Sequence, residues 1–413
     1  MKRLAGWLLL AAAGGLATGQ EAPADASELL DALLGALLED HAEPSPEALQ
    51  AQVAEIGGIP FRSAVTLDYL DRPGLERYLG ELIDTEYPPD VASADTRALT
   101  AFDLLAAGTD LRGLRSRLLL ENVVGFYDER PGRKRLFAIS SDRSLTPINR
   151  IVMVHELRHA LQDQYTDVHA ALPRSVGDFD DRRLAFLSLL EGDATLVMTR
   201  YLEKLFPAAG ALSESALPDP PVTGAPPVLR DQLVRPYVAG LEFAREIERR
   251  GGPGALREAW SRPPRSSEQV LHPEKYFAGE EPLRVSIPWQ PRDARLLLEG
   301  VLGEVFSGTL LGGDGEATRG WGGDLFRCWD VGGGTLLVWK ALWDTPQDES
   351  EFRAALVSRF EASHGPSLQQ GAFRVMTRAG QRVAIGGPPG ATLFLSAEAA
   401  GTLDAALAAL AFP

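Results

Sequence analysis

Residues 147–164 read PINRIVMVHELRHALQDQ, and this stretch decides how the rest of the chain is interpreted. Thr146 is a candidate N-cap, and the proline after it has the backbone angle of a first helical residue. Apolar residues recur around most of the circumference, which predicts a largely buried helix. One turn of this helix carries His155, Glu156 and His159 in the pattern HExxH.

The HExxH pattern indicates metal chemistry. His155 and His159 are four residues apart, so both imidazoles project from one face of the helix and can hold one Zn²⁺. Glu156 lies beside them, where a carboxylate can take a proton from metal-bound water. The alternative is a pair of histidines that merely packs, but such groups are costly in an apolar helix unless something binds them. The pattern therefore predicts a zinc site with Glu156 as general base.

Catalytic zinc usually has three protein ligands and a water, so one more ligand is needed. The candidate is Glu191, in the segment LLEGDA of a second apolar helix predicted at about residues 179–206. Asp193 is the rival, but two residues along a helix turn by about 200°, so only one acid can face the metal. We prefer Glu191 for its apolar flanks. Gly192 is expected to let this helix approach the HExxH helix closely.

Further elements are predicted on both sides of these helices. The β-prone runs 122–128 and 135–140 flank a Pro-Gly turn and predict a hairpin. Residues 62–67 are predicted to form a short strand. Residues 207–229 hold six prolines and form a predicted linker. Further helices are predicted at about residues 73–84 with Asp71 as cap, 94–107, 111–121, 233–250 and 254–260.

The chain changes character from about residue 295. Two β-prone runs, 325–331 and 335–343, flank three glycines, and a helix, two more strand-like runs and a final helix follow. We therefore expect an α+β fold, with a mainly helical core, a small antiparallel sheet beside the HExxH helix and a small α+β C-terminal unit. Cys328 is expected to be a buried small apolar residue.

Composition excludes several kinds of function. With 41 Lys+Arg against 57 Asp+Glu, the net charge of −16 argues against nucleic-acid binding. A single cysteine rules out a disulfide within the chain and a cysteine-based metal site. Residues 1–19 combine a basic start, an apolar stretch and small residues, which predicts a signal peptide and an extracytoplasmic mature chain. No segment of the mature chain is apolar for long enough to span a membrane.

The segment HELRHALQDQY at residues 155–165, followed by the EGDA glutamate, resembles the gluzincin-type zinc metallopeptidases. It is most similar to bacterial extracytoplasmic HExxH proteins whose third ligand lies in an EG-x-A motif. The resemblance covers about residues 120–205, and residues 267–276 also look similar. It implies a zincin-like core, zinc on His155, His159 and Glu191, and hydrolysis of peptide bonds by water that zinc and Glu156 activate. The resulting regions are 1–19, the signal peptide; 20–121, N-terminal and helical; 122–294, catalytic and zincin-like; and 295–413, the C-terminal unit.

The sequence departs from the family pattern in two places. Glu191 follows His159 by 32 residues, a longer gap than in thermolysin-like members, and Thr195 stands where many gluzincins have an aspartate that supports a ligand histidine. Asp163 could supply that support, or could be a solvated residue at the helix end. In zincin folds the strand before the helix binds substrate along its edge, which makes 135–140 the candidate, with an ordinary covering hairpin as the alternative.

The resemblance also implies a second donor to the developing oxyanion, often a downstream His or Tyr. His272 and Tyr276 are the candidates, although a histidine before proline is more often structural. The leading hypothesis is a secreted or periplasmic zinc metallopeptidase acting on peptides or proteins. The alternatives are an inert zinc-containing binding or scaffold protein, which the presence of Glu156 disfavours, and a zinc amidase acting on another amide. The oligomeric state stays open.

Overall fold

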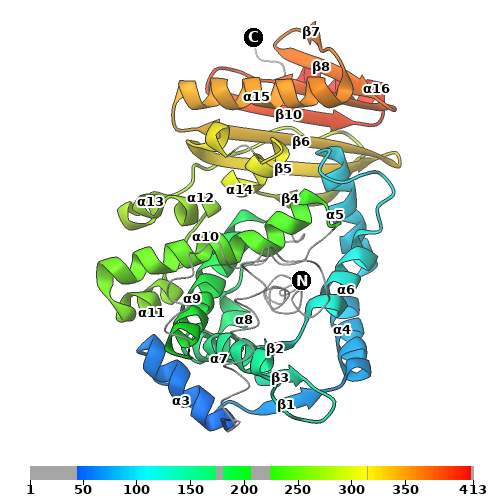
Figure 1. Ribbon diagram of the computed structural model, residues 1–413. Helices are drawn as coiled ribbons and strands as arrows, with labels where there is room; N and C mark the ends of the chain where they lie inside the picture. Colours follow the sequence, from blue (N-terminus) through cyan, green and yellow to red (C-terminus); the bar gives the residue numbers. More distant parts are fainter. Residues whose placement is uncertain (1–43, 174–179, 206–223, 314, 411–413) are drawn as a thin grey trace, which may run out of the picture.

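The computed structural model describes residues 44–173, 180–205, 224–313 and 315–410, so the predicted signal peptide at residues 1–19 lies outside the described residues. The fold is α+β, as predicted. The lower part of the molecule is a group of helices with a small sheet at its lower edge, and a larger sheet with its own helices lies above this part (Figure 1).

The elements have the following bounds. The helices are α3 (Pro46–Gly57), α4 (Arg72–Glu86), α5 (Pro89–Ala101), α6 (Leu111–Asn122), α7 (Pro147–Thr166), α8 (Val168–Ala171), α9 (Asp181–Leu205), α10 (Pro227–Gly251), α11 (Pro253–Ser261), α12 (Ser267–Leu271), α13 (Pro273–Ala278), α14 (Gly303–Leu310), α15 (Pro346–His364) and α16 (Ala400–Leu410). The strands are β1 (Leu67–Leu70), β2 (Gly125–Asp128), β3 (Arg135–Ile139), β4 (Arg295–Gly300), β5 (Trp321–Val331), β6 (Gly334–Trp343), β7 (Leu368–Gln370), β8 (Phe373–Arg378), β9 (Gln381–Gly386) and β10 (Ala391–Ala397).

The predicted caps form, and they fix the starts of two helices. The side chain of Thr146 accepts a hydrogen bond from the backbone N–H of Asn149, and Asp71 does the same for α4. Helix α5 begins earlier than the predicted 94–107, because Pro89 occupies its first turn. The predicted linker at 207–229 lies outside the described residues up to 223, and its last residues already belong to α10.

The small sheet has the order β1-β3-β2, and the predicted hairpin is its β2–β3 pair. Strand β1 pairs with β3 in parallel, so the sheet is mixed rather than antiparallel. Strand β1 shares only Leu67 with the strand predicted at residues 62–67. The prediction that residues 135–140 form an edge is wrong, because β1 covers one side of β3 and β2 covers the other. Both β2 and β3 pack against α7.

Helix α9 lies between α7 and α10. A Cβ added to Gly192 would lie 1.9 Å from the carbonyl oxygen of Gly240 on α10, and one added to Gly240 would lie 2.0 Å from the oxygen of Ser188. Gly192 therefore lets α10 cross α9, and the prediction that it allows approach to the HExxH helix is wrong. The opposite side of α9 is left to face α7.

The larger sheet is antiparallel, with the order β4-β5-β6-β10-β9-β8-β7. Its first strand begins at Arg295, where the C-terminal unit was predicted to begin. Helix α5 nevertheless packs against β4, β5 and β6, and Arg97 on that helix donates to Asp330 and to Gly334 O. One hydrophobic core therefore spans both parts. Cys328 is fully buried in it, as predicted.

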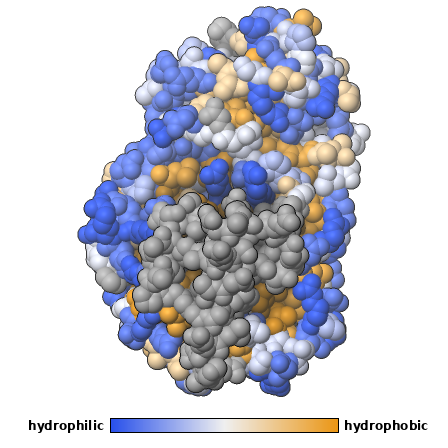
Figure 2. Space-filling model, in the orientation of Figure 1, coloured by the Kyte–Doolittle hydropathy of each residue, from blue (hydrophilic) through white to orange (hydrophobic). Residues whose placement is uncertain are grey.

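Hydrophilic residues dominate the outline of the face shown in Figure 2, and apolar residues gather toward its middle. None of the helices that the structure describes combines a membrane-spanning length with sufficient apolar character.

Candidate metal centre

The structure brings the three predicted ligands together. The Nε2 atoms of His155 and His159, on one face of α7, are 3.0 Å apart, and each lies 3.1 Å from Oε2 of Glu191 on α9. These three residues, called the histidine cluster below, are one of two groups among the described residues that could hold a metal ion.

The histidine cluster fits zinc. Tetrahedral zinc with bonds of about 2.0–2.1 Å places its ligand atoms roughly 3.3–3.4 Å apart. The observed separations are only a few tenths of an ångström shorter, so small outward rotations of the side chains make room for the ion. Two imidazoles and one carboxylate are also a donor set of catalytic zinc sites, which keep a fourth position for water.

Burial and charge differ within the histidine cluster. His155 and Glu191 are buried, whereas 13% of the side-chain surface of His159 is exposed, so solvent can reach this side. Burial lowers the pKa of His155. Burial disfavours charge on His159 and Glu191 too, but their attraction outweighs it, raising the pKa of His159 to about 9 and lowering that of Glu191 to about 2. Metal binding must therefore displace a proton from His159.

Glu156, the predicted general base, connects α7 to the small sheet. It is buried, and its Oε2 accepts a hydrogen bond from the backbone N–H of Tyr127 at 2.9 Å. The N–H of Tyr127 on β2 therefore points toward α7. This contact fixes the carboxylate of Glu156, the residue that follows the candidate ligand His155 in sequence.

Asp193, the rival third ligand, has a different role. Arg158 donates to both of its carboxylate oxygens, at 2.8 and 2.9 Å, and neither side chain is exposed. Only Glu191 of the two acids is grouped with the histidines, as the turn of about 200° requires.

Sequence reasoning missed Gln162, which contacts the candidate ligand His159. Its Oε1 lies 2.9 Å from Nδ1 of His159, and its Nε2 donates to Leu190 O and to Asp193. Its spacing in the sequence could have identified it, because a residue three positions after His159 lies on the same face of the helix.

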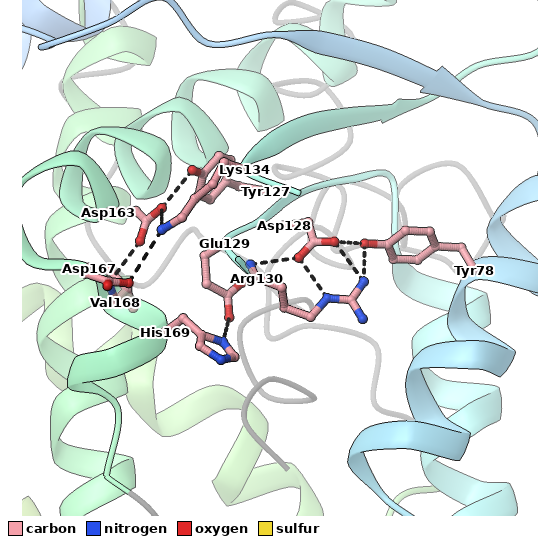
Figure 3. A network of polar contacts seen from close by, with 10 residues as sticks. All are labelled: Tyr78, Tyr127, Asp128, Glu129, Arg130, Lys134, Asp163, Asp167, Val168 and His169. Carbon is pink, nitrogen blue, oxygen red and sulfur yellow. Dashed lines mark hydrogen bonds and ion pairs between the residues drawn. The ribbon is translucent and has the colours of Figure 1, made fainter. Parts of the chain in front are cut away.

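Both predictions for Asp163 are wrong. It is buried rather than solvated, and it supports the hairpin rather than a histidine (Figure 3). It accepts hydrogen bonds from the hydroxyl of Tyr127 at 2.8 Å, Nζ of Lys134 at 2.6 Å and the backbone of Val168 at 2.9 Å. The cause is that the β2–β3 hairpin folds over the end of α7, which sequence spacing cannot show.

A second set of contacts fixes the end of β2 (Figure 3). Arg130 donates to both carboxylate oxygens of Asp128, at 2.9 and 2.8 Å, and the hydroxyl of Tyr78 on α4 joins the pair. Burial opposes ionisation of Asp128, but these hydrogen bonds lower its pKa. Strand β2, which holds Glu156 through its backbone, is therefore anchored on both sides.

The predicted second donors are not brought to the histidine cluster. His272 lies between α12 and α13, where its Nε2 is 3.0 Å from Oε1 of Glu304. Helix α12 is held by Asp181, which lies ten residues, or about 15 Å along α9, from Glu191. The hydroxyl of Tyr276 donates to Arg262 O at 2.9 Å.

An aromatic residue that sequence reasoning missed lies beside the candidate ligands instead. The ring centroid of Tyr237 on α10 is 6.1 Å from that of His155, and the side chain is buried. Its position follows from the crossing of α9 and α10 at their glycines, which the pattern of α10 alone does not reveal.

The second group of potential ligands consists of Glu268, Glu280 and Asp344, called the carboxylate cluster below. The ammonium group of Lys275 lies 2.7, 2.9 and 2.6 Å from their oxygens. A cation of the protein itself therefore already occupies this position.

Residues 290–395 match a family model described as a domain of unknown function (DUF8575). No curated protein and no solved structure matches the chain. The matched stretch covers the larger sheet from β4 into β10 and includes none of the residues of the histidine cluster. The likeness therefore concerns the C-terminal part of the chain.

Proposed function

We propose that the protein is a zinc-dependent metallopeptidase that hydrolyses peptide bonds outside the cytoplasm. The observation that carries this proposal is the histidine cluster, in which three donor atoms lie 3.0–3.1 Å apart with Glu156 next in sequence to His155. Burial of two imidazoles and a carboxylate is costly unless a proton or a metal ion balances the carboxylate, and a purely structural zinc site needs no general base beside it.

Each residue has a distinct role in this proposal. His155, His159 and Glu191 would hold the zinc, which when bound lowers the pKa of a coordinated water and polarises a carbonyl. Glu156 accepts the proton from the attacking water and returns it to the leaving amine. The N–H of Tyr127 keeps the Glu156 carboxylate in place for both transfers. The exposed side of His159 is where water can reach the site.

The residues of the histidine cluster do not select a substrate. An amide in a peptide and an amide in another molecule need the same water, base and metal, so the zinc amidase differs from the peptidase only in what the site admits. The location outside the cytoplasm rests on residues 1–19.

The test compares wild type with Glu156→Gln in a peptide-library cleavage screen analysed by mass spectrometry, after zinc loading. We expect both proteins to carry about one zinc per chain, and we expect Glu156→Gln to lose at least 10³-fold in turnover, because removal of the base leaves metal and binding intact. Glu349→Gln, at a buried glutamate on α15, is the matched control and should keep full activity. Unchanged turnover in Glu156→Gln would reject the mechanism.

A further inference from the structure

The contacts of His159 continue through Gln162 into the interior of the protein. The two residues lie three positions apart on α7, and Nδ1 of His159 is 2.9 Å from Oε1 of Gln162. An amide oxygen can only accept, so Nδ1 carries the hydrogen and donates it. A neutral imidazole then has its lone pair on Nε2, the atom that faces His155 and Glu191.

This arrangement depends on the orientation of the Gln162 amide. A reversed amide would present NH₂ to Nδ1, and His159 would have to adopt the opposite tautomer, which blocks Nε2 with a hydrogen. The other end of the amide prevents reversal. Nε2 of Gln162 donates to Leu190 O at 2.9 Å and to Oδ2 of Asp193 at 2.8 Å. Both partners only accept, so a reversed and fully buried amide would set oxygen against oxygen.

Asp193 is itself fixed by Arg158. The guanidinium donates from Nε to Oδ2 at 2.9 Å and from its terminal nitrogen to Oδ1 at 2.8 Å, and neither side chain is exposed. Gly57 on α3 leaves room for this guanidinium, because a Cβ there would lie 2.4 Å from it. A buried ion pair is weak evidence for stability, since apolar residues of similar volume often serve as well. The ion pair with Arg158 nevertheless fixes the carboxylate of Asp193, which accepts the hydrogen bond from Gln162.

We propose that Arg158, Asp193 and Gln162 form a positioning chain that sets the tautomer of His159 and prepares its Nε2 to bind zinc. The inference rests on the proposed zinc site and specifies how that site is prepared. Arg158 belongs to the HExxH turn and Asp193 follows the ligand Glu191 by two residues, so the two ligand helices also carry the chain that orients one of the ligands.

Gln162→Met tests the positioning chain, because it removes the amide and keeps a side chain of similar length. Gln164→Met is the matched control. Its amide also makes hydrogen bonds, to Arg62 N and Ser63 O, but away from the cluster. With the zinc affinity of the full chain measured by competition with a chromophoric chelator, we expect a 10–100-fold loss for Gln162→Met and less than about twofold for Gln164→Met. Equal affinities for the two variants would overturn the proposal.

Asp193→Asn distinguishes positioning from a structural role. If Asp193 acts through Gln162, the substitution weakens zinc binding in the wild-type background and has no further effect in the Gln162→Met background. If the losses of zinc affinity from the two substitutions add in the double variant, Asp193 does not act through Gln162, and that part of the proposal is overturned.

A spectroscopic measurement observes the Nδ1–H of His159 directly. In zinc-loaded protein with ¹⁵N-labelled histidine, we expect a slowly exchanging, strongly downfield Nδ1 proton in wild type and Gln164→Met, and its loss to solvent exchange in Gln162→Met. A wild type that binds no zinc would overturn both the zinc site and the positioning chain. A wild type that binds zinc, with unchanged affinity in Gln162→Met, would overturn only the positioning chain.

Discussion

The histidine cluster and the carboxylate cluster both place three donors within reach of one cation, but they balance charge differently. Burial alone would lower the pKa of Lys275, yet the three acids that contact it hold that pKa above its ordinary value. In the histidine cluster the balancing charge is a proton on His159, whose pKa Glu191 raises to about 9 despite burial. A metal can displace this proton at neutral pH but cannot displace an ammonium group that is part of the chain. Charge balance therefore separates the two clusters more clearly than donor spacing does.

The largest effect that sharpens this comparison is the pH dependence of zinc binding. Below pH 9 the metal-free cluster holds a proton on His159, whereas Glu191, with a pKa of about 2, is already ionised and the pKa of His155 is lowered. Each zinc ion must therefore displace about one proton, and affinity should rise roughly tenfold per pH unit, or about 100-fold from pH 6.5 to 8.5. Chelator competition, corrected for protonation of the chelator, measures this slope. An affinity that is flat over this range contradicts the assignment of the proton.

A smaller effect is expected when Lys275 is removed. Lys275→Met leaves three carboxylates facing one another, and burial already raises the pKa of one of them, Glu268, to about 7. The free energy of unfolding should fall by about 2 kcal/mol, and added Mn²⁺ or Ca²⁺ should restore part of the loss by taking the place of the ammonium. Thermal unfolding with and without the cation measures both changes.

Lys204→Met is the control for this variant, because Lys204 pairs with Glu55 at an exposed site. It should change stability little and should not respond to added cation. If Lys275→Met is as stable as wild type, the ammonium does not balance the carboxylate cluster, and the contrast between the two clusters fails.

The sequence was most informative where local pattern decides geometry. The four-residue spacing places His155 and His159 on one helix face, and the cap at Thr146 and the hairpin before α7 are equally local features. The apolar flanks of Glu191 indicated a buried acid. Because Glu191 and Asp193 point in nearly opposite directions from the helix, only one of them could face the histidines. These are the parts of the fold and site that sequence spacing describes well.

The errors concern contacts between segments far apart in the chain. Nothing in residues 135–140 indicates that β1 will cover that strand, and the hairpin residues that surround Asp163 come from about thirty positions upstream. Gly192 was recognised as a close-approach position, but its partner Gly240 lies on a helix whose packing no local pattern encodes. The packing of α5 against the larger sheet is likewise a contact between distant segments that no local pattern encodes.

The most direct test of the zinc site is anomalous diffraction at the zinc absorption edge from crystals of the zinc-loaded protein. We expect one strong peak about 2.0–2.2 Å from Nε2 of His155, Nε2 of His159 and a carboxylate oxygen of Glu191, with Lys275 still in the carboxylate cluster. A peak at the carboxylate cluster instead, or none at the two histidines, would contradict the zinc site and the function proposed from it.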